Sequence, residues 1–200
     1  EYHNMGQKGK EIQLTKFIPS RNICSLLAAD QLRPFEEIEA GAKLSGQVNM
    51  VQEPAFKLDM CCIRPIQDQD AIHVSRCAYR TYGYSYSPYI YYPEKILEKN
   101  RDGSIYSLVA ASKDGIILGH EAMEFDYPGA RIAEVGVLFV QPEYRCSGLA
   151  AEITARMVSM AQEMSLEGLY GRTVTSHHGS QKVASKQGFV NCGLQLGGFV

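Results

Sequence analysis

The segment with the clearest chemical meaning runs from Val140 to Ala150, where an apolar strand leads through a short polar loop into a helix. The loop has the spacing Arg145-x-x-Gly148-x-Ala150. A strand–loop–helix junction of this kind directs several backbone N–H groups to one place, at the positive end of the helix dipole. The sequence therefore predicts an anion site, for which a pyrophosphate group is a natural occupant.

The elements that must position this loop alternate along the chain after residue 57. Hydrophobic periodicity predicts strands over 60–66, 104–112, 116–125, 132–140, 169–174 and 190–196, and helices over 69–80, 93–100, 148–164 and 180–187. Asp68 is expected to cap the first helix, and the turn 113–115 to close a hairpin. Gly188 is expected to end the last helix in a left-handed conformation, with Phe189 as its hydrophobic contact. This order predicts an α/β fold.

Together, the loop and the order of elements resemble the GNAT family of acetyl-CoA-dependent N-acyltransferases. The family signature, the strand that approaches it and the late Gly-Phe pair are matched by Val140, Pro142, Arg145, Gly148, Ala150, Gly188 and Phe189. The resemblance covers residues 58–196. It implies the GNAT fold, a central mixed, mostly antiparallel sheet flanked by helices. We expect this domain to span residues 58–200, after an N-terminal extension or remnant of a preceding domain in residues 1–57.

The resemblance also implies acetyl-CoA as the cosubstrate, and no metal. Loop amides would hold the coenzyme A pyrophosphate, and the strand before the loop would bind the pantetheine arm through its backbone. The implied binding residues are Leu138, Phe139, Val140, Arg145, Cys146, Ser147, Gly148, Leu149 and Ala150. Gly148 and Ala150 are small enough for a close approach. Where the strand separates from its neighbour, a freed N–H can polarise the thioester carbonyl.

Glu134 is the candidate general base, because many GNAT relatives carry a Glu on this strand that accepts the amine proton. Its even spacing from Leu138 predicts that the two side chains share a face. The alternative is a solvated carboxylate near the start of the strand. The acid that many relatives place on the late helix is a Tyr, but Ala184 occupies that position here. A thiol with a pKa of about 8.5 needs little help, so water or another Tyr can protonate it.

Seven of the 12 tyrosines lie within residues 79–92. We predict that Tyr82, Tyr84 and Tyr86 border the acceptor, because aromatic faces and hydroxyls can hold a cationic amine. The same rings could instead cover the core or a homodimer interface. His177 and His178 could face the acceptor as bases, but the sequence favours a role at the start of a helix.

Composition argues against several other classes of protein. A net charge of −2 gives no broad electrostatic footprint for nucleic acid, and no apolar run reaches a membrane-spanning length. The six cysteines form no Cys-x-x-Cys pair and no zinc pattern. We therefore expect reduced thiols in a cytoplasmic protein without a signal peptide. Because the first residue is not Met, we also expect the chain to be part of a longer protein.

Two functions from different classes follow. The first is an N-acetyltransferase that moves an acetyl group to a primary amine, on a small molecule or a protein, by direct attack. The second is a coenzyme A-binding regulatory or sensor domain with little turnover. Glu134 favours the enzyme, and the lack of a Tyr at Ala184 favours the sensor. Residues 4–18 resemble the end of a histidine-kinase-like ATPase module, to which a sensor could be fused, or they form an ordinary surface strand.

Overall fold

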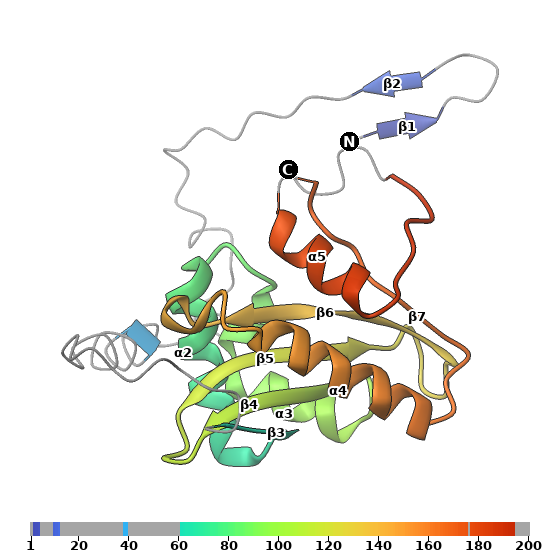
Figure 1. The fold of residues 1–200 in the computed structure, drawn as a ribbon. Helices are drawn as coiled ribbons and strands as arrows, with labels where there is room; N and C mark the ends of the chain where they lie inside the picture. The colour runs from blue at the N-terminus through green and yellow to red at the C-terminus, as the bar shows by residue number, and fades with distance from the viewer. Residues whose placement is uncertain (1, 5–9, 13–37, 40–60, 176, 195–200) are drawn as a thin grey trace, which may run out of the picture. The chain divides into compact units, whose positions relative to one another are not determined.

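The computed structural model describes residues 2–4, 10–12, 38–39, 61–175 and 177–194 (Figure 1). The chain divides into two units, residues 1–32 with 190–200, and residues 33–189. In the first unit, β1 (Tyr2–Asn4) and β2 (Lys10–Ile12) pair as an antiparallel ladder. Residues 13–18, part of the segment 4–18 that has two alternative interpretations, lie outside the described residues, as does the predicted domain boundary after residue 57.

A five-stranded sheet forms the centre of the second unit. Its strands, in their spatial order, are β3 (Cys61–Pro65), β4 (Ile105–Ser112), β5 (Ile117–Glu124), β6 (Ile132–Val140) and β7 (Gly168–Tyr170). All neighbouring pairs are antiparallel except β6 and β7. The prediction of a mixed, mostly antiparallel sheet is therefore confirmed.

Helices cover both faces of this sheet. One face carries α2 (Ala71–Tyr82), the 3-10 turn η6 (Pro88–Tyr91) and α3 (Pro93–Arg101), and the other carries α4 (Leu149–Glu163), with α5 (His178–Lys186) packed against α4 (Figure 1). All four predicted helices are present, with small shifts at their ends. Among the residues that the structure describes, no helix is both long enough and apolar enough to cross a membrane.

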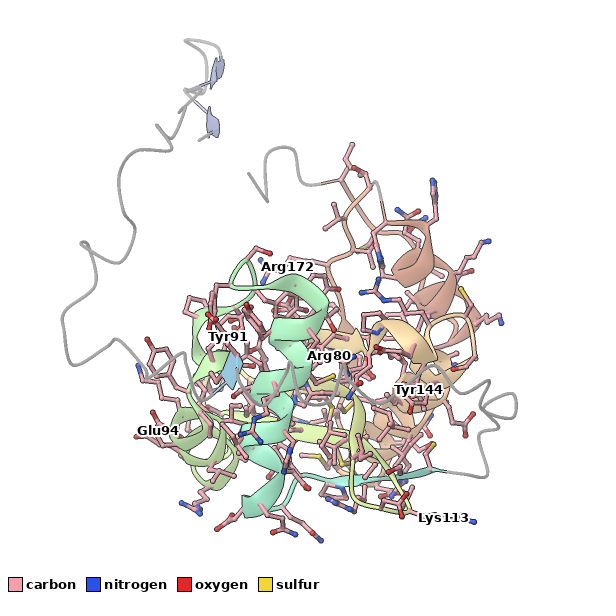
Figure 2. The ribbon with its side chains drawn as sticks, turned by 90° about the vertical axis from the view of Figure 1, so that its left-hand side faces the viewer. Arg80, Tyr91, Glu94, Lys113, Tyr144 and Arg172 are labelled. Atoms are coloured by element: carbon pink, nitrogen blue, oxygen red, sulfur yellow. The ribbon has the colours of Figure 1, made fainter. Side chains whose placement is uncertain are left out.

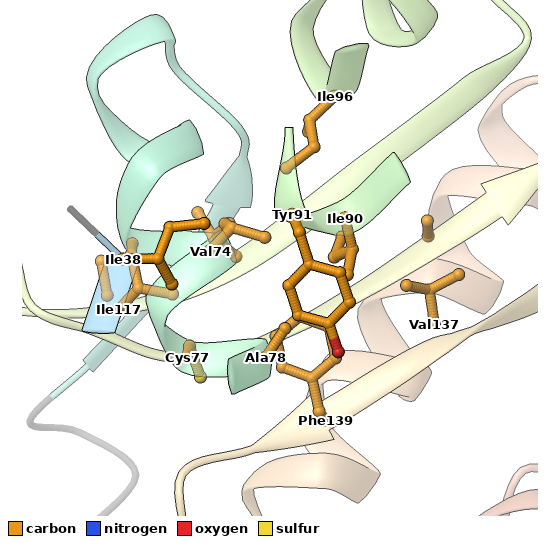
Figure 3. Close-up of a cluster of buried hydrophobic side chains, with 13 residues drawn as sticks. Ile38, Val74, Cys77, Ala78, Ile90, Tyr91, Ile96, Ile117, Val137 and Phe139 are labelled. Carbon is orange, nitrogen blue, oxygen red and sulfur yellow. The ribbon is translucent and has the colours of Figure 1, made fainter. Parts of the chain in front are cut away.

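Each face of the sheet buries its own hydrophobic cluster. On the α2 side, Val74, Ile90, Ile96 and Phe139 are at most 2% exposed, and the ring of Tyr91 lies among them (Figure 3). The cluster on the α4 side contains the stripe predicted for that helix: Leu149, Ile153 and Met157 are buried, and Met160 and Met164 are partly buried against them. Burial of aliphatic side chains on both faces is the main source of stability for such a layered domain.

Two predicted ends differ from the structure. Asp68 is not the helix cap: it lies in the 3-10 turn η5 (Asp68–Asp70) and pairs with Arg101 at the surface. Asp70 is the N-cap residue of α2, but its buried carboxylate makes no cap hydrogen bond to the helix. It accepts instead from the Gln67 N–H at 2.7 Å and from Arg64. Burial alone would raise the pKa of Asp70, but these hydrogen bonds hold it below its usual value.

The second difference lies at the C-terminal side. β7 ends at Tyr170 instead of residue 174, because beyond it the chain no longer pairs with β6. Residues 190–194 form no strand, and Val190 and Leu194 are 85% and 69% exposed. The strand predicted there is therefore wrong over these residues. By contrast, Gly188 has the predicted left-handed φ of +82°, and the Phe189 N–H bonds back to the Ala184 carbonyl at 3.1 Å.

Two adjacent titratable side chains are buried in the middle of β5, on opposite faces of the sheet. His120 is 0% exposed and stacks on Phe139, and Glu121 is 2% exposed and accepts a 3.0 Å hydrogen bond from the Thr154 hydroxyl on α4. Burial raises the pKa of Glu121 to about 8, although the bond from Thr154 acts in the opposite direction. Glu121 is therefore a neutral acid through most of the neutral range.

The raised pKa of Glu121 makes stability depend on pH. Between pH 4.5 and about 8 the carboxyl is protonated in the folded chain and ionised in the unfolded chain, so stability falls as pH rises through this window. Gln has the shape of the neutral acid and does not titrate. At about 1.4 kcal/mol per pKa unit, we expect Glu121→Gln to gain a few kcal/mol over the wild type on going from pH 5 to about 8.

Denaturant unfolding of both proteins at several pH values measures this difference, and the titration of His120 cancels between them. A pH-independent difference in unfolding free energy would show that Glu121 is ionised in the fold.

Candidate functional site

The site begins where β6 loses its second neighbour. β6 pairs with β7 only through Ile132, Ala133 and Glu134, whose partner is Tyr170. The ladder stops after Tyr170, the last residue of β7. At the following residue, Gly171, an added Cβ would lie 3.0 Å from the Val135 carbonyl oxygen. Among the residues that the structure describes, no strand pairs with β6 on that side from residue 136 to 140, so the backbone groups of this edge can bind an extended ligand.

A bulge shapes the same stretch of β6. On β5, Ala122 pairs with Gly136 and His120 with Phe139, so two residues of β6, Val137 and Leu138, oppose one residue of β5. Val137 has a φ of +53°, a costly conformation for a β-branched residue. The bulge also reverses the alternation of side chains along the strand.

The reversal corrects one prediction about Glu134. Glu134 pairs with Glu124, and Phe139 pairs with His120 on the same face of β5, so Glu134 faces the same side as Phe139. Leu138, the second residue of the bulge, directly precedes Phe139 and faces the opposite side. The predicted shared face of Glu134 and Leu138 is wrong, because even spacing holds only in an unbroken strand.

The loop after β6 has the geometry of an anion site. The 3-10 turn η7 (Pro142–Tyr144) leads to Cys146 with a φ of +61° and Gly148 with a φ of +90°, directly before α4. Left-handed residues in close succession turn backbone N–H groups toward one point. The Ser147 hydroxyl donates to the Tyr144 carbonyl at 2.6 Å and accepts from the Leu149 N–H at 3.3 Å.

The backbone amides that follow Leu149 in α4 receive no such help from a side chain, because no side chain of the described residues caps the helix. Within the described chain, the N–H groups of Ala150 and Ala151 have no side-chain cap. They belong to the first helical turn, whose amides lack intrahelical acceptors. The predicted binding loop, residues 145–150, therefore presents free donors at the positive end of a helix of 15 residues, which fits a pyrophosphate.

Arg80 anchors this loop to α2. The Arg80 side chain, labelled in Figure 2, is 13% exposed. Its guanidinium donates to the side-chain oxygens of Gln141 and Glu143. Gln141 is itself buried, and its side-chain amide donates to the Ile117 carbonyl at the start of β5. Contacts to α2 and to β5 therefore both hold the turn that precedes the binding loop. Arg80 could not be singled out from the sequence, because its partners lie 61 and 63 residues away in the chain.

Glu134 lies at the point where β6 and β7 part. Both of its carboxylate oxygens accept from Arg172, which Figure 2 labels, at 2.8 Å each. The Glu134 side chain is 15% exposed. Tyr170 also lies beside it: burial raises the pKa of Tyr170, and the charge of Glu134 raises it further. On the neighbouring strand, the Glu124 carboxylate accepts a 2.9 Å hydrogen bond from the Tyr89 hydroxyl. Two carboxylates therefore face the α2 side of the sheet at this point.

The predicted acceptor tyrosines lie on that same side. Tyr82 and Tyr86 are stacked, with ring centroids 4.6 Å apart, and Tyr86 meets Phe139 edge to face at 5.8 Å. Tyr84 instead packs on Tyr79 and Tyr91, and its hydroxyl donates to Glu39 at 3.1 Å. Tyr86, with Tyr82 stacked on it, therefore lies against Phe139 of β6, whereas Tyr84 contacts the other two rings and is 42% exposed.

The face of β6 that carries Glu134 has open space at Gly136, two residues further along the strand. At Gly136, on the face shared with Glu134, no heavy atom of the described chain lies within 4 Å of the position that a Cβ would take. Opposite Gly136, the small side chain of Ala122 adds no bulk. The charge of Arg145 acts on Tyr82, whose pKa is nevertheless raised by burial, so the acceptor side and the binding loop are close neighbours.

Other predicted features fall outside this constellation. His177 caps α5, with its Nδ1 accepting from the Ser180 N–H at 3.2 Å, as the helix-start interpretation predicted. Ala184 lies on α5 and offers no acid. No group of three or more metal-ligating side chains occurs in the described ranges. His120, Glu121, Glu124 and Arg172 were not singled out from sequence, although a His-Glu pair inside an apolar strand was a visible signal.

Comparisons with known proteins agree with this geometry. The model of the acetyltransferase (GNAT) family matches residues 70–189, more than half of the chain. None of the curated proteins matches. The family model does not cover residues 4–18, so the ATPase-like module suggested there stays a prediction.

Several solved structures share the fold. They include the ribosomal-protein-S5-alanine acetyltransferase of Vibrio fischeri, with a TM-score of 0.58 at 18% identity over 70% of this chain and 85% of that one. The spermidine N-acetyltransferase of Vibrio cholerae, in complex with CoA and spermine, gives 0.55 at 16% identity over 68% and 83%. The aminoglycoside antibiotic 6'-N-acetyltransferase AAC(6')-Ih of Acinetobacter baumannii gives 0.54 at 14% identity over 68% and 95%. With its sheet, its parted strands and its loop, the chain belongs to the acetyltransferase (GNAT) family.

Proposed function

We propose that this acetyl-CoA-dependent N-acetyltransferase transfers the acetyl group to a primary amine by direct attack. The observation that carries the proposal is the free edge of β6, which leads into the left-handed loop at the start of α4 and has Glu134 at its other end. Bound acetyl-CoA supplies an activated acetyl thioester. In the overall reaction a C–N bond forms and the C–S bond breaks, and the coenzyme leaves as a thiol.

On the donor side, we assign the binding of acetyl-CoA to backbone groups. The amides of residues 145–150 hold the pyrophosphate, and residues 138–140 bind the pantetheine arm along the free edge. The loop is exposed at Arg145 and Cys146, so an anion reaches it without a change in the fold. Because the bulge places one more residue on β6 than on β5, an N–H at Val137 or Leu138 lacks a ladder partner, and we assign it to the thioester carbonyl.

On the acceptor side, we assign the removal of the amine proton to Glu134. The amine must lose a proton as it attacks, and the carboxylate can accept it through a water molecule. Arg172 holds this carboxylate in one orientation, and the open surface at Gly136 lies next to it. With Ala184 in place of an acid, the thiolate takes its proton from solvent.

The same side favours an amine that arrives as a cation. Glu124 and Glu134 face it, and the stacked rings of Tyr82 and Tyr86 provide π surfaces for a cationic group. The relatives named above act on a protein, on polyamines and on aminoglycosides, so both small molecules and proteins belong in the acceptor panel.

The assignment of the loop predicts a selective effect of Gly148→Ala. A side chain at a φ of +90° costs about 1–2 kcal/mol and displaces the amides that bind the pyrophosphate. We expect the acetyl-CoA Kd, measured by calorimetry, to rise at least about tenfold. Gly129→Ala is the matched control, since Gly129 has a φ of +85° at the far end of β6 and should lose stability without losing affinity. Equal Kd values for both variants would contradict the assignment.

The assignment of Glu134 predicts that Glu134→Gln lowers kcat by about 100-fold or more, because Gln cannot accept the amine proton. Its acetyl-CoA Kd should stay unchanged. The measurement is thiol release with spermidine, an aminoglycoside, a lysine peptide and a peptide with an N-terminal alanine. Glu167→Gln, which breaks only an exposed ion pair with Arg131, should behave as the wild type. Acetyl-CoA binding without release for any acceptor would favour the sensor function.

A further inference from the structure

The bulge in β6 needs a specific cause. Val137 keeps a φ of +53°, a conformation that costs a β-branched residue on the order of 1–3 kcal/mol. Regular pairing with β5 would remove that cost and also the free N–H. The surrounding structure must therefore make contacts to the bulge that a regular strand would lose.

His120 makes such a contact. Its ring is 0% exposed, and Nδ1 lies 3.0 Å from the Val137 carbonyl oxygen. Because a carbonyl can only accept, Nδ1 carries the proton and donates it. The ring also stacks on Phe139, with centroids 5.0 Å apart and an interplanar angle of 21°. The histidine thus holds the residue at the bulge and the residue that follows it.

We propose that His120 is a positioning residue for acetyl transfer: its Nδ1–H holds the Val137 carbonyl, and this fixes the bulge that turns a backbone N–H of β6 toward the thioester. The proposal rests on the proposed function, because it assumes that this N–H acts on a bound acetyl group. His120 itself touches no reacting atom.

Two further observations indicate that the His120 ring is neutral and carries its proton on Nδ1. Burial lowers the pKa of His120 to about 4, although the bond to Val137 acts in the opposite direction, so the ring stays neutral. Within the described chain, Nε2 is buried without a hydrogen-bond partner. An unpartnered buried nitrogen is costly, and the cost is least when Nε2 carries no proton and Nδ1 makes the bond.

These facts define a matched pair of variants. In Asn the side-chain nitrogen is two bonds from Cβ, as Nδ1 is in His, so His120→Asn keeps a donor for the Val137 carbonyl. His120→Phe keeps the ring, its volume and the contact with Phe139 but removes the donor. A role in packing alone would be served better by Phe, whereas a role in positioning would be served better by Asn.

We expect His120→Phe to lower kcat about 10- to 100-fold, since displacing a transition-state donor by a fraction of an ångström has effects of this size. The acetyl-CoA Kd should change little, because the loop at Gly148 is untouched. His120→Asn should recover most of the lost kcat. Wild-type kcat in the Phe variant, or an Asn variant as slow as the Phe variant, would overturn the proposal.

A measurement without turnover separates this proposal from the proposed function. Long-range ¹⁵N–¹H NMR of the histidine rings in the full chain should show His120 as the Nδ1–H tautomer at neutral pH, with the signal identified by its loss in His120→Asn. An Nε2–H tautomer overturns the role of His120 even if the enzyme is active. If no acceptor is acetylated, the proposed function fails, and the tautomer alone decides whether His120 holds the bulge.

Discussion

β6 pairs with β5 from Glu134 to Val140, apart from the bulge at Val137 and Leu138, but it loses β7 after Glu134. The site depends on this parting of two parallel strands. Backbone donors and acceptors inside a sheet need partners, and here the protein leaves a row of them free. The bulge at Val137 belongs to the same feature, because it turns the free edge and separates the faces to which Glu134 and Leu138 point. The proposed sites for the acetyl donor and for the amine acceptor thus both lie along β6.

The layers of the fold serve this arrangement. α4 places the positive end of its dipole at the end of the free edge, and its stripe from Leu149 to Met157 holds it against the sheet. On the other face, α2 carries Arg80 to the turn before the loop and Tyr82 to the acceptor side. Glu121 lies opposite the bulge and His120 beside it, and within the described chain each has a buried polar atom without a hydrogen-bond partner. Such local costs are typical of functional regions.

Much of this could be predicted from the sequence. The strand of residues 132–140, the loop with Arg145 and Gly148, and α4 follow from periodicity, turn chemistry and helix signals, which are local. The bulge could not be predicted, because its cause is a bond from His120, 17 residues away, and it made the expected face of Leu138 wrong. The cap at Asp70 instead of Asp68 likewise depends on Arg64, a residue of the preceding strand.

The central claim is that the donor lies along the free edge of β6 and ends at the loop before α4. Amide hydrogen exchange of the full chain with and without acetyl-CoA tests it most directly, because it reports which backbone N–H groups the donor covers. Protection should rise at residues 137–140 and 145–151 and stay unchanged on β3 and β4, which lie on the other side of β5. Protection confined to other segments, or none at a saturating donor concentration, would contradict the account.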